Sequence, residues 1–96
     1  MFPIGQTVQT AGIHHECQND PVFAFNVQNA FRRYLKKDWG DLTQGDKDLN
    51  DQAVASGDDR ILASYWIVNS RAERKKVYII TEYDRSVTTV LFADEY

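Results

Sequence analysis

Four consecutive residues near the N-terminus, His14, His15, Glu16 and Cys17, carry side chains of the kinds that bind transition metals. Adjacent side chains diverge, whereas zinc ligands on one element usually stand about two to four residues apart and are completed from elsewhere. The chain has no other histidine or cysteine to complete four ligands. We therefore predict no metal site and no cofactor, and a structural or loop role for these residues.

Asp46, Asp48 and Asn50 form a second candidate, because their alternating spacing is similar to the start of a calcium-binding loop. Such a loop needs Gly for the sharp turn at its sixth position and a bidentate Glu at its twelfth. Asp51 and Gly57 stand at these two positions instead. The sequence therefore does not predict a calcium site.

A third candidate is the charged turn formed by Glu82, Tyr83, Asp84 and Arg85. Carboxylates beside a guanidinium could supply a general base and an anion clamp. However, the chain has no Gly-rich phosphate loop, no Cys–His pair at a useful spacing and no nucleophile elbow. An ion pair within an ordinary surface turn explains the same residues. We predict no catalytic residue and no enzymatic activity, and keep the four residues as the ligand site of an alternative, a small enzyme or ligand-binding module.

Composition and length describe the kind of molecule that must position these groups. The 96 residues are 43% hydrophobic and 26% charged, which predicts one globular domain over residues 1–96. A single cysteine cannot form an intramolecular disulfide and favours a reducing cytosol. The N-terminus lacks the parts of a signal peptide, and no window approaches the roughly 18 apolar residues of a membrane span. We predict a cytoplasmic protein without membrane contact.

Three runs rich in β-branched and aromatic residues predict strands at residues 60–68, 76–82 and 87–92. Residues 6–13 alternate more loosely and are a candidate edge strand. Since the last three runs are consecutive and separated by polar turns, we predict an α+β fold with an antiparallel sheet of three to four strands. One main helix and a shorter polar helix should cover this sheet.

The main helix is predicted over residues 21–37, because Asp20 is a good N-cap and Pro21 suits the first helical turn. Its apolar residues recur at spacings of three and four and should lie on the sheet. They are Phe23, Val27, Ala30, Phe31 and Tyr34. If Phe31 is fully buried, its replacement by alanine should cost about 3–5 kcal/mol.

The shorter helix is predicted over residues 44–56. Thr43 is placed to act as its N-cap, and Gly57 offers a C-terminal stop. Leu49 and Ala53 are its predicted anchors to the rest of the protein.

Charge is distributed unevenly along the chain. The net charge is −3, yet residues 38–59 hold seven aspartates against one lysine, a net −6, so the remainder sums to +3. An acidic segment can dock on a basic channel that normally holds nucleic-acid phosphates. The residues that we predict to bind a protein partner are Asp38, Trp39, Asp41, Asp46, Asp48, Asp51, Asp58 and Asp59. An equally supported interpretation is that these carboxylates only cap and solvate two helix ends.

The net charge and its distribution also indicate whether the chain should bind nucleic acid. We predict no direct binding of nucleic acid, because a net acidic protein lacks the basic face that such binding usually needs, although the sequence leaves room for a local basic patch. Residues 69–76 predict a basic surface turn. The sequence leaves the oligomeric state open, homo-oligomers included.

Several stretches have a distinctive composition when taken together. They are residues 38–42 (DWGDL) followed by Asp46 and Asn50, residues 60–65 (RILASY), and residues 80–89 (ITEYDRSVTT). In these stretches the sequence resembles a family of small proteins carried by plasmids, phages and integrative elements and described only as plasmid-related. The resemblance extends from about Thr7 to Tyr96, with Ala93 and Asp94 in place of a more typical Pro-containing turn.

The resemblance implies a genetic setting but no reaction, so it assigns no catalytic role to any residue of this chain. Genes of this family often travel with anti-restriction and anti-CRISPR genes. The resemblance therefore implies a small inhibitor of host defence, and our hypothesis is that it binds a defence complex without catalysis.

Overall fold

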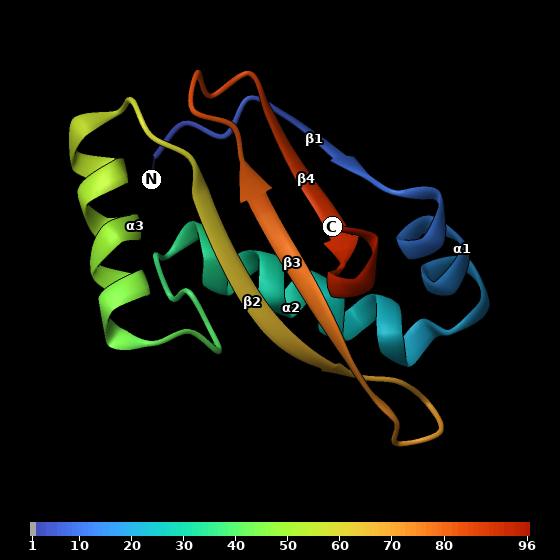
Figure 1. The fold of residues 1–96 in the computed structure, drawn as a ribbon. Helices are drawn as coiled ribbons and strands as arrows, with labels where there is room; N and C mark the ends of the chain where they lie inside the picture. The colour runs from blue at the N-terminus through green and yellow to red at the C-terminus, as the bar shows by residue number, and fades with distance from the viewer. Residues whose placement is uncertain (1) are drawn as a thin grey trace.

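Four strands and three α-helices follow one another along the chain, which the computed structural model describes from residue 2 to residue 96 (Figure 1). In chain order the elements are β1 (Gln6–Gln9), α1 (Ala11–Asn19), α2 (Pro21–Leu35), α3 (Gln44–Ser56), β2 (Ile61–Val68), β3 (Arg74–Thr81), β4 (Val87–Phe92) and the 3-10 turn η1 (Ala93–Glu95). The predicted α+β class is confirmed, and α1 is one helix more than predicted.

The strands form one sheet in the order β1-β4-β3-β2. The last three are antiparallel neighbours as predicted, with Ala63 opposite Ile79 and Ile79 opposite Val90. β1 is an edge strand but runs parallel to β4, so the expected antiparallel sheet is mixed instead. Strands joined by a hairpin must be antiparallel, whereas β1 reaches β4 only through the rest of the chain and is free of that constraint.

The N-terminal strand is shorter than the predicted residues 6–13, because α1 begins directly after it. The side chain of Thr10 caps this helix by accepting a hydrogen bond from the backbone N–H of Ile13. The loop interpretation of residues 14–17 is therefore wrong. Ile13 is the one residue of α1 that is buried, so the segment offers little apolar periodicity from which a helix could be predicted.

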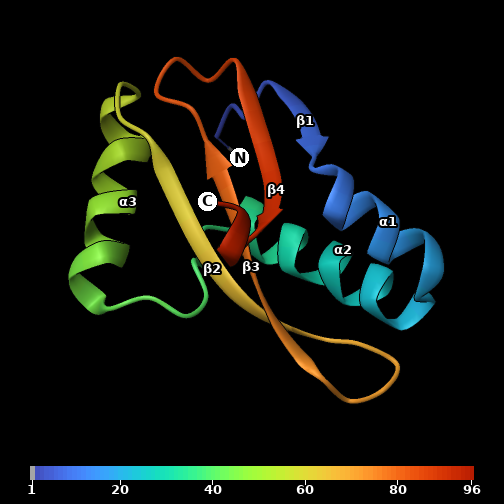
Figure 2. The same cartoon turned by 45° about the vertical axis from the view of Figure 1, so that its right-hand side comes forward.

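Helix α2 begins where Asp20 and Pro21 predict it and crosses one face of the sheet (Figures 1 and 2). The Asp20 carboxylate accepts the backbone N–H groups of Val22 and Phe23, each at 3.1 Å, which satisfies donors that a helix start leaves free. Its other oxygen accepts the N–H and hydroxyl of Ser70. These bonds, that of the Ser70 N–H above all, hold the pKa of Asp20 below its usual value.

The apolar stripe of α2 faces the sheet as predicted, although its members are buried to different degrees. Phe23, Ala30 and Tyr34 are buried, while Val27 and Phe31 are partly covered. The last two line a hollow of about 690 Å³ between α2 and β1. Phe31 is not fully buried, so the loss of about 3–5 kcal/mol expected for a fully buried ring does not apply to it. A strand of four residues leaves that side of the helix open.

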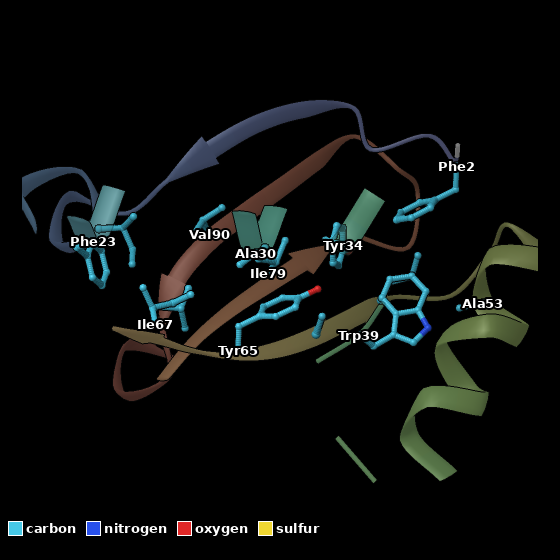
Figure 3. Close-up of a cluster of buried hydrophobic side chains, with 14 residues drawn as sticks. Phe2, Phe23, Ala30, Tyr34, Trp39, Ala53, Tyr65, Ile67, Ile79 and Val90 are labelled. Carbon is cyan, nitrogen blue, oxygen red and sulfur yellow. The ribbon is translucent and has the colours of Figure 1, made fainter. Parts of the chain in front are cut away.

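A cluster of buried side chains fills the space between α2 and the sheet (Figure 3). The ring of Tyr34 meets the rings of Phe2 and Trp39 edge-on, at centroid distances of 5.5 and 5.4 Å. Tyr65 is covered on β2 and donates its hydroxyl to the backbone carbonyl of Asp38 at 2.7 Å. The large aromatic side chains thus bury their rings while their polar ends keep partners.

Three hydroxyl groups form a line through this core. Tyr34 Oη lies 2.6 Å from Thr81 Oγ1, which lies 2.7 Å from Thr88 Oγ1. Thr88 donates to the backbone carbonyl of Ile4 at 2.7 Å. Each hydroxyl has one hydrogen, so this last bond sets the direction of the others: Thr81 donates to Thr88, and Tyr34 donates to Thr81.

Helix α3 has both predicted caps in place, but one of its predicted anchors is wrong. Ala53 is buried, whereas Leu49 is 61% exposed. The second anchor is Asn50, whose side chain donates to the carbonyl of Leu62 at 2.8 Å and accepts the N–H of the same residue at 3.3 Å. The amide pairs with the outer edge of β2 as a neighbouring strand would, which protects that edge.

The second face of the sheet lies open. Figures 1 and 2 show no α-helix of residues 2–96 across it, and the C-terminal turn η1 lies on this side. Alternation along β2 places Ser64 on this face. Ser64 is 1% exposed, and within the described chain its Oγ is the one buried side-chain polar atom without a hydrogen-bond partner.

Replacing Ser64 by alanine is expected to leave the free energy of unfolding unchanged or to raise it by up to about 1 kcal/mol, because alanine has no hydroxyl to desolvate. Urea unfolding of the two proteins measures the difference. Thr88→Val is the matched control. It removes a hydroxyl with partners on both sides and should cost about 1–3 kcal/mol. An equal loss in both variants would contradict the expectation.

Candidate protein interface

The eight residues that we predict to bind a partner lie on α3 and in the segments before and after it, but they do not form one group. Seven are exposed and Trp39 is buried. Three of the seven carboxylates bond to basic or indole groups of the chain itself. The other four make no ion pair with any of residues 2–96: Asp46, Asp48, Asp58 and Asp59.

Asp38 stabilises the turn that follows α2. Its oxygens accept the guanidinium of Arg33 at 2.8 and 3.3 Å and the backbone N–H of Gly40 at 3.2 Å. The hydrogen bonds from Arg33 lower the pKa of Asp38 below its usual value. Both side chains of the pair are about half exposed, at 50% and 52%, so solvent screens the interaction.

Asp41 lies beside the open face of the sheet. Its Oδ2 accepts the indole N–H of Trp66 at 3.0 Å and stands 3.7 Å from Nζ of Lys76. Its backbone N–H donates to the carbonyl of Ser64, on the outer edge of β2. This carboxylate therefore positions side chains on the sheet.

Trp39 belongs to the core rather than to the surface. It is 2% exposed, and its indole N–H donates to Oδ1 of Asp51 at 2.9 Å. Asp51 thereby joins α3 to the segment before it. A buried indole offers no area to a partner, so the observed role of Trp39 and Asp51 is to position α3.

A hollow of about 370 Å³ lies between α3 and β2. Its apolar lining is Leu42, Leu49 and Leu62, and its acidic lining is Asp46 and Asp59. Leu49 is largely exposed beside it. A concave apolar floor with carboxylates at the rim suits a protruding side chain that has an aliphatic stem and a cationic end.

Two further residues complete the hollow, Asn50 and Arg60. The amide of Asn50 is already bonded to β2. The guanidinium of Arg60 lies over the ring of Tyr96, 5.5 Å from its centroid, which turns its charge toward the C-terminus. The two aspartates therefore dominate the charge of the rim.

The alternative ligand site, Glu82 to Arg85, has a different arrangement from the anion clamp that its residue types suggest. The guanidinium of Arg85 donates to four backbone carbonyls, those of Ala53, Asp59, Glu82 and Tyr83. Arg85 also has a positive φ of 61°, as the tight turn requires. With its donors used in this way, Arg85 joins the end of α3 to the β3–β4 turn.

The remaining members of this turn act locally or face solvent. Asp84 accepts the backbone N–H of Ser86 at 3.0 Å, and hydrogen bonds from Ser86 lower the pKa of Asp84 below its usual value. Tyr83 is 64% exposed. The residues of this turn therefore do not converge on a cavity through Arg85.

The run His14 to Cys17 lies on α1. His14 and His15 are exposed, and Cys17 is partly covered, where burial raises the pKa of its thiol. No three His, Cys, Asp or Glu side chains within residues 2–96 are grouped so that they could hold a metal ion.

Comparisons with known proteins place the chain in no family. No family model, no curated protein and no solved structure matches it. No helix in residues 2–96 is both long enough and apolar enough to cross a lipid bilayer.

Sequence reasoning identified the acidic rim but missed the apolar floor. The sequence predicts Leu49 as an anchor of the helix, because it is an apolar residue on a mostly polar helix. The sequence offered no signal against that interpretation, because Leu49 stands four residues before Ala53 and helical spacing places the two on one face. Leu42 and Leu62 come together with it only in the folded chain.

Proposed function

We propose that this chain is a non-catalytic binding protein that docks α3 and its hollow on a basic surface of a protein partner. The partner is a protein that binds nucleic acid. In the setting that the family resemblance implies, it belongs to a host defence complex, and the chain acts as an anti-CRISPR-like inhibitor encoded by a mobile element, in the host cytosol.

The observation that supports this proposal is the combination of unpaired carboxylates with an exposed apolar side chain. Asp46, Asp48, Asp58 and Asp59 have no cation partner in the described residues, and Leu49 projects beside Asp46. Carboxylates in such an array resemble phosphates to a basic channel and accelerate the encounter with it. An apolar anchor near the charges supplies the desolvated contact that binding energy usually requires.

The test begins with capture of nucleic-acid-binding defence complexes and measurement of their affinity for two matched double variants. Asp46→Asn with Asp58→Asn should weaken binding about two- to 30-fold, at roughly 0.2–1 kcal/mol for each exposed charge. Glu16→Gln with Asp94→Asn makes the same change in net charge away from α3 and should leave the affinity unchanged. Neither carboxylate of the first pair makes an ion pair in the described structure, and Asp46 bonds to Thr43 through its backbone N–H, which asparagine keeps, so the stability of the variant should be retained.

Two further measurements sharpen the result. Affinity should fall with rising salt, because exposed charges are screened over about 10 Å at 0.1 M. Leu49→Ala should weaken binding without changing the salt dependence. Equal affinities for the two double variants, together with no effect of salt, would overturn the proposal.

A further inference from the structure

A second surface, on the open face of the sheet, has a charge opposite to that of α3. It is formed by the outward side chains of β2 and β3 and by the C-terminal residue. Its aromatic and basic members are Arg60, Trp66, Arg74, Lys76, Tyr78 and Tyr96. We refer to these six residues as the sheet-face patch.

Trp66 is the centre of the patch. It is 45% exposed, in contrast to the buried Trp39. The guanidinium carbon of Arg74 lies 4.7 Å from the centroid of its ring, and Nζ of Lys76 lies 5.4 Å from it. Asp41 accepts its indole N–H at 3.0 Å. The exposed ring is therefore held in one orientation, with two cations near it, before any ligand arrives.

The aromatic surface continues along the sheet from Trp66. Tyr78 is the next outward residue of β3 after Lys76, which pairs with Trp66, so it is the diagonal neighbour of the indole. The ring of Tyr96 meets Tyr78 edge-on at a centroid distance of 5.8 Å. Tyr96 is 61% exposed, and Arg60 lies over it at 5.5 Å. Two aromatic groups, each with a cation beside it, thus follow one another on the same face.

The hairpin that carries Arg74 is basic as a whole. Residues 71–76 hold four basic residues and one glutamate, a net +3. That glutamate, Glu73, is 3.2 Å from Arg71, and hydrogen bonding from Asn69 lowers its pKa below the usual value. Figures 1 and 2 show the hairpin projecting beyond the helices. The acidic groups of α3 lie away from this hairpin, near Leu62 and beside Arg60, the one member of the sheet-face patch that also lines the acidic hollow.

We propose that the sheet-face patch binds single-stranded nucleic acid. An unpaired base stacks on the indole of Trp66, and the adjoining phosphates meet Arg74 and Lys76. Stacking of bases on exposed aromatic rings, beside cations that follow the backbone, is the chemistry by which proteins hold single strands. Bases within a duplex keep their faces against one another, so a duplex offers phosphates to the cations but no base to the indole. The overall charge of −3 opposes binding across the surface as a whole, so the interaction depends on the local basic residues of the patch.

The intrinsic fluorescence of the protein provides a direct test. Of the two tryptophans, Trp39 is in the core, so a ligand that stacks on the surface quenches Trp66. Titration with an oligothymidylate of about ten nucleotides, a length typical of single-strand sites, should quench the fluorescence. The logarithm of the binding constant should fall with the logarithm of salt concentration with a slope of about −1.5 to −2, as expected for two to three phosphate contacts.

Variants are compared by the anisotropy of a labelled oligothymidylate. Trp66→Ala should weaken binding about five- to 150-fold, the equivalent of roughly 1–3 kcal/mol for one stacked base. Arg74→Ala with Lys76→Ala should weaken binding and lower the salt slope. Arg32→Ala with Lys36→Ala removes two exposed cations, one near the end of α2 and one directly after it, and should change neither the affinity nor the salt slope. An emission maximum of Trp39 at the short wavelength of a buried indole shows that the Trp66→Ala protein is folded.

Several results would overturn the proposal. They are the absence of quenching, equal binding of a duplex of the same length, or equal loss in the two double variants. Competition by poly-glutamate as strong as that by the oligonucleotide would assign the patch to acidic protein segments instead. Because the variants leave α3 intact, failure here is distinguishable from failure of the proposed acidic interface.

Discussion

Replacement of Trp39 by alanine is expected to lower the free energy of unfolding by about 3–5 kcal/mol, the usual cost of deleting a large aromatic side chain from a core. Trp39 is 2% exposed and contacts Phe2 and Tyr34 at centroid distances of 5.7 and 5.4 Å. The substitution also removes the donor to Asp51. Thermal or urea unfolding, followed by circular dichroism, measures the loss.

The second tryptophan is a natural control for this experiment. Trp66→Ala removes the same side chain from a site that is 45% exposed, so it should cost less than about 1.5 kcal/mol. Trp39→Phe keeps a ring in the core and should fall between the two. If both alanine variants lost the same stability, the assignment of Trp39 to the core would be wrong, and its role in partner binding would have to be direct.

Stability is expected to decrease steeply above pH 10, because two tyrosines are buried in their neutral form. Burial raises the pKa of Tyr34 from 10.0 to about 12, and raises the pKa of Tyr65 further. The charged form of tyrosine is the deprotonated one, so the unfolded chain loses its protons first. The stabilisation is fully present below pH 10 and is lost as pH rises toward the folded-state pKa, by about 1.4 kcal/mol per pH unit for each tyrosine.

Urea unfolding between pH 7 and pH 11.5 tests this expectation. Tyr34→Phe should reduce the slope above pH 10 by about half, since one buried tyrosine remains. At pH 7 this substitution should cost little stability. Tyr34 is the first donor in the line of hydroxyls, so the loss of its hydroxyl leaves only an acceptor lone pair on Thr81 unused. Tyr83→Phe alters a side chain that is 64% exposed and should leave the profile unchanged. A profile that is flat to pH 11.5 would show that neither ring is buried.

The fold could be predicted from the sequence wherever a local signal determines the structure. Asp20 and Pro21 mark the start of α2, Thr43 and Gly57 bound α3, and alternation of apolar residues identifies the three C-terminal strands. Two features lacked such a signal. The sequence of α1 has one buried residue, and the parallel pairing of β1 with β4 depends on contacts between the two ends of the chain.

The candidate sites show a similar division. The excess of aspartate between residues 38 and 59 was evident from composition alone. Composition could not show that Asp38, Asp41 and Asp51 each hold a neighbouring side chain, because those partners are chosen by the tertiary fold. In the same way, the residue type of Arg85 suggested an anion clamp, whereas the tertiary fold directs its guanidinium to four backbone carbonyls. The sheet-face patch combines residues from two strands and the C-terminus, and no single stretch contains its pattern.

The position of β1 affects how the protein reaches its folded state. The hairpins β2–β3 and β3–β4 join neighbours along the chain and can form early. The bond from Thr88 to Ile4 instead closes a loop of 84 residues, for which the loss of chain entropy is about 4 kcal/mol before any constant is added. Pairing of β1 is therefore favourable only after the other strands and α2 have come together. Folding would end with the N-terminal segment, and a sheet of three strands with an uncovered edge at β4 would precede the native state.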